Sequence, residues 1–186
     1  MNDDKYLGRY RIPSARAWWH QYNGGTYFVT ICTKDRERYF GEINDSEMKL
    51  SSMGECLKEQ ILVTEKMRAD MNVEIPLYVI MPNHVHLIVV IGNTVRRDAM
   101  HCVSTTDGMH CVSTNGKAFA PQSKNLASII RGIKIGTKAF ATKHNIEFAW
   151  QPRYHDHIVR NVDELNAIAI YIENNVVNWK EDDFYR

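Results

Sequence analysis

The segment Tyr78–Val90, with the sequence YVIMPNHVHLIVV, constrains the fold of this 186-residue chain more than any other stretch. Two runs rich in Val, Ile and Leu flank a Pro-Asn break, which predicts a strand, a short turn and a second, buried strand. Because side chains alternate between the faces of a strand, His84 and His86 should point to one face and Val85 to the other.

This His-x-His pair has two interpretations. It is either a pair of histidines satisfied by hydrogen bonds beside a core, or part of a metal site. Imidazole is the commonest metal ligand, and two protein ligands leave positions for substrate oxygens. The strongly apolar strand around His84 and His86 favours the metal site. The pair alone does not name a reaction, since metal hydrolases and nucleotidyl transferases both use it.

The composition is that of one soluble globular domain, with 44% hydrophobic and 24% charged residues. No apolar run is long enough to cross a membrane, and the first residues lack the apolar core of a signal peptide. Four cysteines in a chain of this length do not indicate a disulfide scaffold. We therefore expect a cytoplasmic protein that does not contact a membrane.

The net charge of +1 conceals a sorting of charge along the chain. Residues 117–160 carry eight Lys or Arg against two Asp or Glu, an excess of +6. Residues 161–186 carry two against six, an excess of −4. Separate basic segments suit a phosphate backbone. The alternative is a solvated basic surface without a partner.

Residues 1–25 are expected to form a basic, aromatic arm, in which Arg9 and Arg11 precede Trp18. Such a mixture either grips a nucleic-acid backbone and stacks bases or packs its tryptophans on the domain. The domain itself is expected at residues 26–180, and it should begin with a strand at Thr26–Thr33.

The order of the following elements predicts an α+β fold. A helix is expected at Ser52–Ala69, capped by Ser52 with Glu55, and the strand pair follows from Val73 to Ile91. Strand, helix, strand, strand favours a central antiparallel sheet with helices on one face. Within residues 94–122 the sequence MHCVST occurs twice. Its adjacent His-Cys pairs do not match usual zinc-ligand spacing, so this segment is interpreted as a flexible insertion.

A basic helix is expected at Lys124–His144, capped by Ser123. Its outer face should carry four cationic residues, Lys124, Arg131, Lys134 and Lys138. This face is the strongest candidate in the sequence for binding phosphates.

A last helix is expected from Val162 to about Val177, with Asn161 as its N-cap. Tyr171 and Asn175 are one helical turn apart on its flank, so both polar ends can reach one cleft. Taken alone, Tyr171 would be an ordinary tyrosine at the edge of a core.

The motifs occur in a characteristic order: TYFVTICT, PNHVH, the basic helix, WQPRYHDHIVR at residues 150–160, and Tyr-Ile-x-x-Asn on the last helix. In this the chain resembles the single-tyrosine HUH transposases, and among them the REP-associated tyrosine transposases. The resemblance covers residues 10–179. The MHCVST duplication is not part of the family pattern. Asn175 suits the REP-associated branch, whereas insertion-element relatives tend to have Gln there.

The resemblance implies a ferredoxin/RRM-like HUH fold and an enzyme that nicks and rejoins single-stranded DNA beside a hairpin. Tyr171 would be the nucleophile and would form a 5′-phosphotyrosine intermediate. His84, His86 and Asn175 would hold a divalent cation, Mg²⁺ or Mn²⁺.

The partner implied is a single-stranded DNA hairpin, bound by a monomer or a homodimer. Its stem would lie on the basic helix, and flanking bases would stack on Trp18 or Trp150, with Arg153 in the same block as Trp150. Two rivals remain open: a non-catalytic nucleic-acid-binding module, and a metal phosphodiesterase that uses water and to which Tyr171 is incidental.

Overall fold

The computed structural model describes Lys5–Tyr6, Tyr10–Arg11 and residues 22–92 and 124–185. Arg9, Trp18 and the MHCVST repeat lie outside the described residues. Arg11 belongs to β2 (Tyr10–Arg11), which pairs with β1 (Lys5–Tyr6). The arm and the insertion proposed from the sequence are therefore not tested by the fold.

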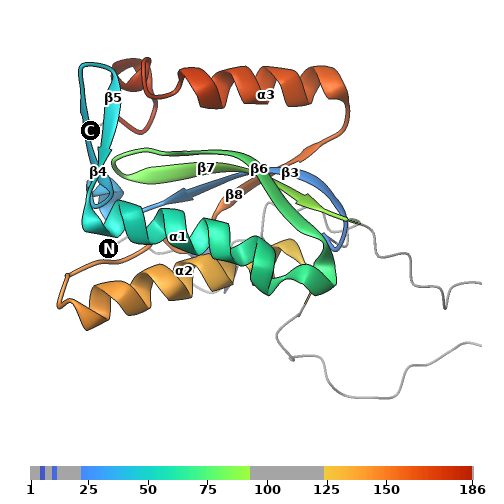
Figure 1. Cartoon of the computed structure of the whole chain (residues 1–186), viewed down its shortest axis with the longest axis horizontal. Helices are drawn as coiled ribbons and strands as arrows, with labels where there is room; N and C mark the ends of the chain where they lie inside the picture. The colour runs from blue at the N-terminus through green and yellow to red at the C-terminus, as the bar shows by residue number, and fades with distance from the viewer. Residues whose placement is uncertain (1–4, 7–9, 12–21, 93–123, 186) are drawn as a thin grey trace, which may run out of the picture.

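The centre of the molecule is a four-stranded antiparallel sheet in the order β6-β7-β3-β8 (Figure 1). Its strands are β3 (Gly25–Cys32), β6 (Val73–Ile80), β7 (His84–Ile91) and β8 (His155–Val159). The predicted strand pair is confirmed, and the predicted first strand is displaced by one residue. The strand that carries the His-x-His pair lies in the interior of the sheet, between β6 and β3.

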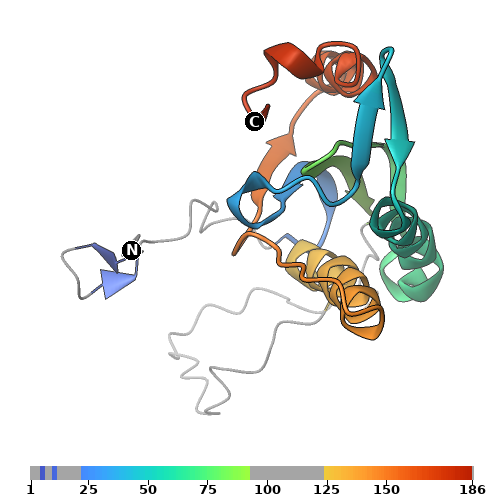
Figure 2. The ribbon, with the colours of Figure 1, turned by 90° about the vertical axis from the view of Figure 1, so that its left-hand side faces the viewer.

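Two helices, α1 (Ser52–Met67) and α2 (Leu126–Lys143), cover one face of this sheet, and α3 (Val162–Asn174) lies over the other face (Figures 1 and 2). The α+β architecture is confirmed. The expectation that all helices share one face is wrong for α3. An apolar stripe predicts that a helix packs on a sheet but not on which face, and this placement brings α3 to the histidines.

The two sheet faces differ as the strand periodicity predicts. Val85 and Leu87 of β7 are fully buried among residues of α1 and α2, together with Val29 and Ile31 of β3. The alternate residues point to the α3 side. The apolar core therefore holds β7 rigidly, and the residues between its core positions are presented to the opposite face.

One hairpin and three 3-10 turns complete the described fold. The hairpin consists of β4 (Gly41–Asn44) and β5 (Glu47–Leu50), and the turns are at Lys34–Arg36, Ala69–Met71 and Trp179–Glu181. Asp45 and Ser46 at the hairpin turn both have positive φ, 50° and 63°, as a type I′ turn requires. The sequence reading missed this hairpin. It also missed β8, because an edge strand in an antiparallel sheet tolerates the polar residues of the 150–160 block.

The helix caps differ from two of the three predictions. Ser51, not Ser52, accepts the hydrogen bond from the Gly54 amide, at 3.2 Å. Asn125 caps α2 through a capping box with Ser128, and the expected cap, Ser123, is outside the described residues. Asn161 caps α3 as predicted, with its Oδ1 2.8 Å from the Glu164 amide nitrogen.

None of the helices in the described part of the chain is both long and apolar enough to cross a membrane.

The packing of α1 onto the β4 side of the fold depends on Gly54. A Cβ atom there would lie 2.2 Å from the Phe40 carbonyl oxygen. We expect Gly54→Ala to lower the free energy of unfolding by about 1–3 kcal/mol, because backbone must move to admit the methyl group. Gly132→Ala is the matched control, since its Cβ would meet nothing closer than Arg68 at 3.7 Å. It should raise stability by about 0.5–1 kcal/mol. Urea unfolding of both variants checks this, and equal effects would contradict it.

Candidate active site

His84 and His86 leave β7 on the α3 side and are buried, with 0% and 1% of their surface exposed. They are paired in register with Cys32 and Thr30 of β3. Their Nε2 atoms lie 3.0 Å apart. The two imidazoles therefore point to the same face, as predicted, and their Nε2 atoms face one another.

The other nitrogen of each ring is held by a neighbour. Asn83 Oδ1 lies 2.8 Å from His84 Nδ1. The Asn83 amide group donates to the Arg36 and Phe184 carbonyls, at 3.1 and 2.9 Å, which fixes its oxygen toward the ring. An amide oxygen only accepts, so His84 Nδ1 carries the proton and Nε2 has the free lone pair. Thr30 Oγ1 lies 2.8 Å from His86 Nδ1 and can accept its proton in the same way.

Burial keeps both imidazoles neutral. Burial lowers the pKa of His86 to about 4. Burial, followed by the proximity of His86 and Arg36, lowers the pKa of His84 to about 2. Neutral imidazole is the form that binds a metal, so the pair is ready for a cation at neutral pH.

Tyr171 and Asn175 approach the histidines from α3. The Tyr171 hydroxyl lies 3.2 Å from His86 Nε2, and its ring meets Phe28 edge-on at 6.1 Å between centroids. The helix ends at Asn174, but Asn175 keeps helical dihedral angles (φ −61°, ψ −40°), so the predicted one-turn relation holds. Burial is the main cause that raises the pKa of Tyr171, and the charge of Asp182 adds to it.

Asp182 is a member of the site that the sequence reading missed. Its carboxylate, His84 and His86 offer ligand atoms that all lie within 4.8 Å of one another. The residue follows the turn Trp179–Glu181, which returns the chain to the sheet. The only sequence signal was the acidic run at residues 181–183, and no spacing rule connects that run to His84 and His86.

Asn175 gives an independent sign that the site takes a ligand. It is 3% exposed, and its amide nitrogen donates to Asp182 Oδ2 at 3.2 Å. Its Oδ1 is buried and has no hydrogen-bond partner among the described residues. A buried amide oxygen without a partner is costly unless something binds there.

These residues fit a divalent cation. Two ligands at right angles, each roughly 2.1 Å from an ion, lie about 3 Å apart, which matches the separation of the two Nε2 atoms, 3.0 Å. A carboxylate and an unpartnered amide oxygen complete a mixed nitrogen and oxygen ligand set. The His-His-Asp group is thus able to bind a metal.

Comparison with known proteins identifies one relative by its sequence and one similar protein by its structure. No family model matches the chain. An uncharacterized protein of Haemophilus influenzae is 32% identical over 166 residues, which are 87% of this chain and 85% of the relative. The chain belongs to the family of this protein.

A solved structure of a REP-associated tyrosine transposase bound to a REP hairpin matches with a TM-score of 0.55 and 19% identity. The match covers 90% of this chain and 74% of that one. The chain has the REP-associated tyrosine transposase fold. The resemblance found in the sequence is thereby confirmed at the level of the fold. In this chain, β7, which carries His84 and His86, is an interior strand of the sheet.

Three of the four basic residues predicted to share one face, Arg131, Lys134 and Lys138, line one groove along α2, and Lys124 does not. Lys124 precedes α2, with φ of 65°, and pairs with Asp70 at 3.2 Å. Lys134 Nζ donates to the Gln151 carbonyl at 2.8 Å and to the Arg153 carbonyl. Lys138 Nζ donates to the Phe148 carbonyl. Lys124, Arg131 and Lys138 are exposed, and Lys134 is partly buried. Lys134 and Lys138 hold the segment after α2 in place.

Trp150, Arg153 and Tyr154 lie in that segment, on the α2 side of the sheet. The Trp150 indole nitrogen donates to the Lys134 carbonyl at 3.2 Å. Tyr154 lines the same groove as Trp150 and Arg131. The fold therefore separates two sets of predicted site residues: the histidines and Tyr171 on one face, and the aromatic and basic residues on the other.

Asp182 should matter for metal affinity. We expect Asp182→Asn to weaken Mn²⁺ binding roughly 10- to 100-fold, because the variant removes a negative charge and disturbs the bond that orients Asn175. Isothermal titration calorimetry measures this without any DNA. The control is Asp183→Asn, which removes the neighbouring, exposed carboxylate. An equal loss of Mn²⁺ affinity in both variants would instead attribute the effect to the overall negative charge of this segment.

Proposed function

We propose that this chain is a metal-dependent enzyme that nicks and rejoins single-stranded DNA at hairpin-forming repeats. One observation carries the proposal: the Tyr171 hydroxyl lies 3.2 Å from His86 Nε2, at the edge of a cluster that fits a divalent cation. A nucleophile next to a phosphate-binding cation is the arrangement that strand transfer through a covalent intermediate needs.

In the proposed reaction the Tyr171 oxygen bonds to the scissile phosphorus, and the bond from phosphorus to the 3′ oxygen breaks. The products are a 5′-phosphotyrosine and a free 3′-hydroxyl. The new ester conserves the energy of the phosphodiester, so a 3′-hydroxyl can reverse the step and rejoin the strand without ATP. His84, His86, Asn175 and Asp182 would hold Mg²⁺ or Mn²⁺, which when bound neutralises charge on the attacked phosphate and orients it.

The Tyr171 proton must leave during attack. Burial raises the pKa of this hydroxyl, so Tyr171 enters the reaction protonated at neutral pH. Asn175 opposes that shift by hydrogen bonding. The proton goes to a group of the site or to the attacked phosphate, and the departing 3′ oxygen takes up one proton to become the hydroxyl. His86 is excluded from this role while its Nε2 serves as a ligand, because the same lone pair is needed for both.

Binding of the DNA is assigned to the basic and aromatic residues on the α2 side and in the arm. The proposed contacts are Arg9, Arg11, Trp18, Lys124, Arg131, Lys134, Lys138, Trp150 and Arg153. The arm (residues 1–25) and the insertion (about 94–122) are proposed as accessory parts of a cytoplasmic enzyme, monomeric or homodimeric, built on residues 26–180.

The basic surface gives a quantitative prediction. Lys134 and Lys138 bind carbonyls, so the informative variant is Lys124→Gln with Arg131→Gln. We expect weaker DNA binding and a shallower dependence on salt, by roughly 0.7 in slope per lost single-strand contact and 0.9 per duplex contact. Fluorescence anisotropy at several salt concentrations measures this. Lys58→Gln with Lys66→Gln on α1 is the charge-matched control. An unchanged salt slope in the first variant would show that Lys124 and Arg131 are solvated and do not contact DNA.

Covalent capture tests the proposed function as a whole. A hairpin oligonucleotide with single-stranded flanks, incubated with Mg²⁺ or Mn²⁺ and resolved under denaturing conditions, should yield a protein–DNA adduct. Cleavage without an adduct would identify the water-using phosphodiesterase. Binding without cleavage would identify the non-catalytic module.

A further inference from the structure

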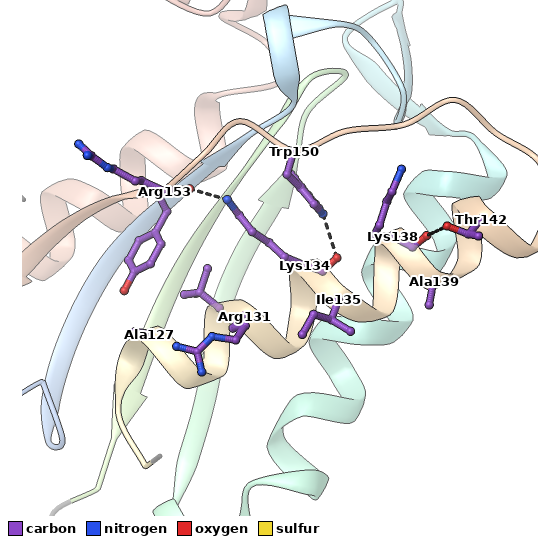
Figure 3. A pocket seen from close by; sticks show the side chains of 11 residues that line it. Ala127, Arg131, Lys134, Ile135, Lys138, Ala139, Thr142, Trp150 and Arg153 are labelled. Atoms are coloured by element: carbon purple, nitrogen blue, oxygen red, sulfur yellow. Dashed lines mark hydrogen bonds between the residues drawn. The ribbon is translucent and has the colours of Figure 1, made fainter. Parts of the chain in front are cut away.

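A groove of about 700 Å³ runs along α2, between the helix and the segment that follows it (Figure 3). Its aliphatic lining comes from α2, namely Ala127, Ile130, Ile135 and Ala139. Ile135 is 61% exposed and adds an uncovered apolar side chain to this lining. Trp150 and Tyr154 face this lining from the other side. The groove has the size and apolar character of a site for a flat organic group.

Only cationic side chains bring charge to this groove. Arg131, Lys134, Lys138 and Arg153 line it, and no carboxylate does so among the described residues. An apolar floor under a positive rim complements a ligand that is flat and apolar in one part and anionic in another. A nucleotide is such a ligand, because its base stacks on aromatic groups and its phosphate binds Arg.

The groove is built before any ligand arrives. Lys134 donates to the Gln151 and Arg153 carbonyls, and the Trp150 indole donates to the Lys134 carbonyl at 3.2 Å. Lys134 Nζ also lies 5.7 Å from the centre of the Trp150 ring. Figure 3 shows Trp150 and Arg153 held over α2 in this way. A fixed aromatic wall reduces the ordering cost of binding.

The groove is separate from the candidate active site. Its floor is α2, which lies on the opposite face of the sheet from α3 (Figure 1). Tyr171 belongs to α3, and its hydroxyl contacts His86. A ligand here would not touch the reacting atoms. It would instead hold the DNA at a second point.

We propose that this groove binds one unpaired base of the DNA substrate, with the adjoining phosphates on Arg131 and Arg153. This rests on the proposed function in that DNA is taken as the substrate. A duplex presents phosphates on its outer surface and hides its bases, so it would leave the aliphatic floor and Ile135 uncovered. An unpaired base covers both. The groove thus distinguishes DNA with an exposed base from a continuous duplex.

The test combines an abasic scan with two protein variants. Each unpaired position of a fluorescein-labelled hairpin with single-stranded flanks is replaced in turn by an abasic nucleotide, which keeps the phosphate. Affinity is measured by anisotropy in EDTA, so that no cleavage is needed. Ile135→Glu places a carboxylate in the groove. Leu62→Glu, at a 49% exposed position of α1, is the matched control.

One abasic position should weaken binding by about tenfold to the wild-type chain and to Leu62→Glu. In Ile135→Glu, the same abasic substitution should lower the affinity by less than about twofold, because this variant no longer binds the base in the groove. The proposal is overturned if no abasic position matters, as expected for a groove that takes a protein segment, or if the tenfold cost persists in Ile135→Glu.

This outcome is independent of the proposed reaction. If the chain forms the tyrosine adduct but no abasic position weakens binding, the proposed reaction is supported and base binding in the groove is contradicted. If one abasic position weakens binding but no adduct forms, base binding in the groove is supported and the proposed reaction is contradicted.

Discussion

Replacing Tyr171 by phenylalanine should abolish the covalent protein–DNA adduct while the chain still folds and binds the hairpin. The hydroxyl is the only group removed, and it lies 3.2 Å from His86 Nε2. The ring keeps its edge contact with Phe28 and remains 44% exposed, so little packing is lost. Denaturing electrophoresis after incubation with hairpin DNA and Mn²⁺ should show no adduct above background.

Tyr154→Phe is the matched control and should still form the adduct. Tyr154 lies in the charged block near His155 and His157, which makes it the second candidate by sequence alone. In the fold it lines the groove on α2, on the opposite side of the sheet from the histidines. Peptide mapping of the wild-type adduct should place the nucleotide on Tyr171. An adduct on Tyr154 would remove the nucleophile from α3 and with it the proposed pairing with Asn175.

The parts of this site that follow from local periodicity were predictable. The alternation of a strand places His84 and His86 on one face whatever the rest of the fold does. The turn of a helix does the same for Tyr171 and Asn175, and this holds even though α3 ends one residue before Asn175. In each case two residues close in sequence are related by a repeat that tertiary packing does not alter.

The parts that depend on long-range contacts were not predictable in this way. Asp182 reaches the histidines because the chain turns back after α3, and no local pattern encodes that return. Lys134 and Lys138 have the spacing of a phosphate-binding face, yet their ammonium groups are taken by carbonyls of the next segment. Sequence spacing places a charge on a helix, but the packing of the next segment decides which groups that charge also binds.

Replacing either His84 or His86 by alanine should reduce cleavage by about 10³-fold or more while hairpin binding changes little. Loss of a ligand removes several kcal/mol of charge stabilisation from the attacked phosphate. The basic residues assigned to DNA binding lie elsewhere, so affinity should persist. Single-turnover cleavage and anisotropy measure the two effects, and excess EDTA should stop the wild-type chain. His144→Ala, an exposed histidine at the end of α2, is the control.

The same variants separate two roles that the geometry offers to His86. Its Nε2 lies 3.0 Å from His84 Nε2 and 3.2 Å from the Tyr171 hydroxyl, so its lone pair can bind a cation or accept the tyrosine proton, but not both at once. If His86 is a ligand, His84→Ala and His86→Ala fail alike, and both weaken Mn²⁺ binding in calorimetry. If His86 is instead the base, wild-type cleavage survives EDTA and His84→Ala retains activity. That second pattern would overturn the metal assignment and leave Tyr171 activated by an imidazole whose burial already holds its pKa near 4, which makes it a weak base for a phenol.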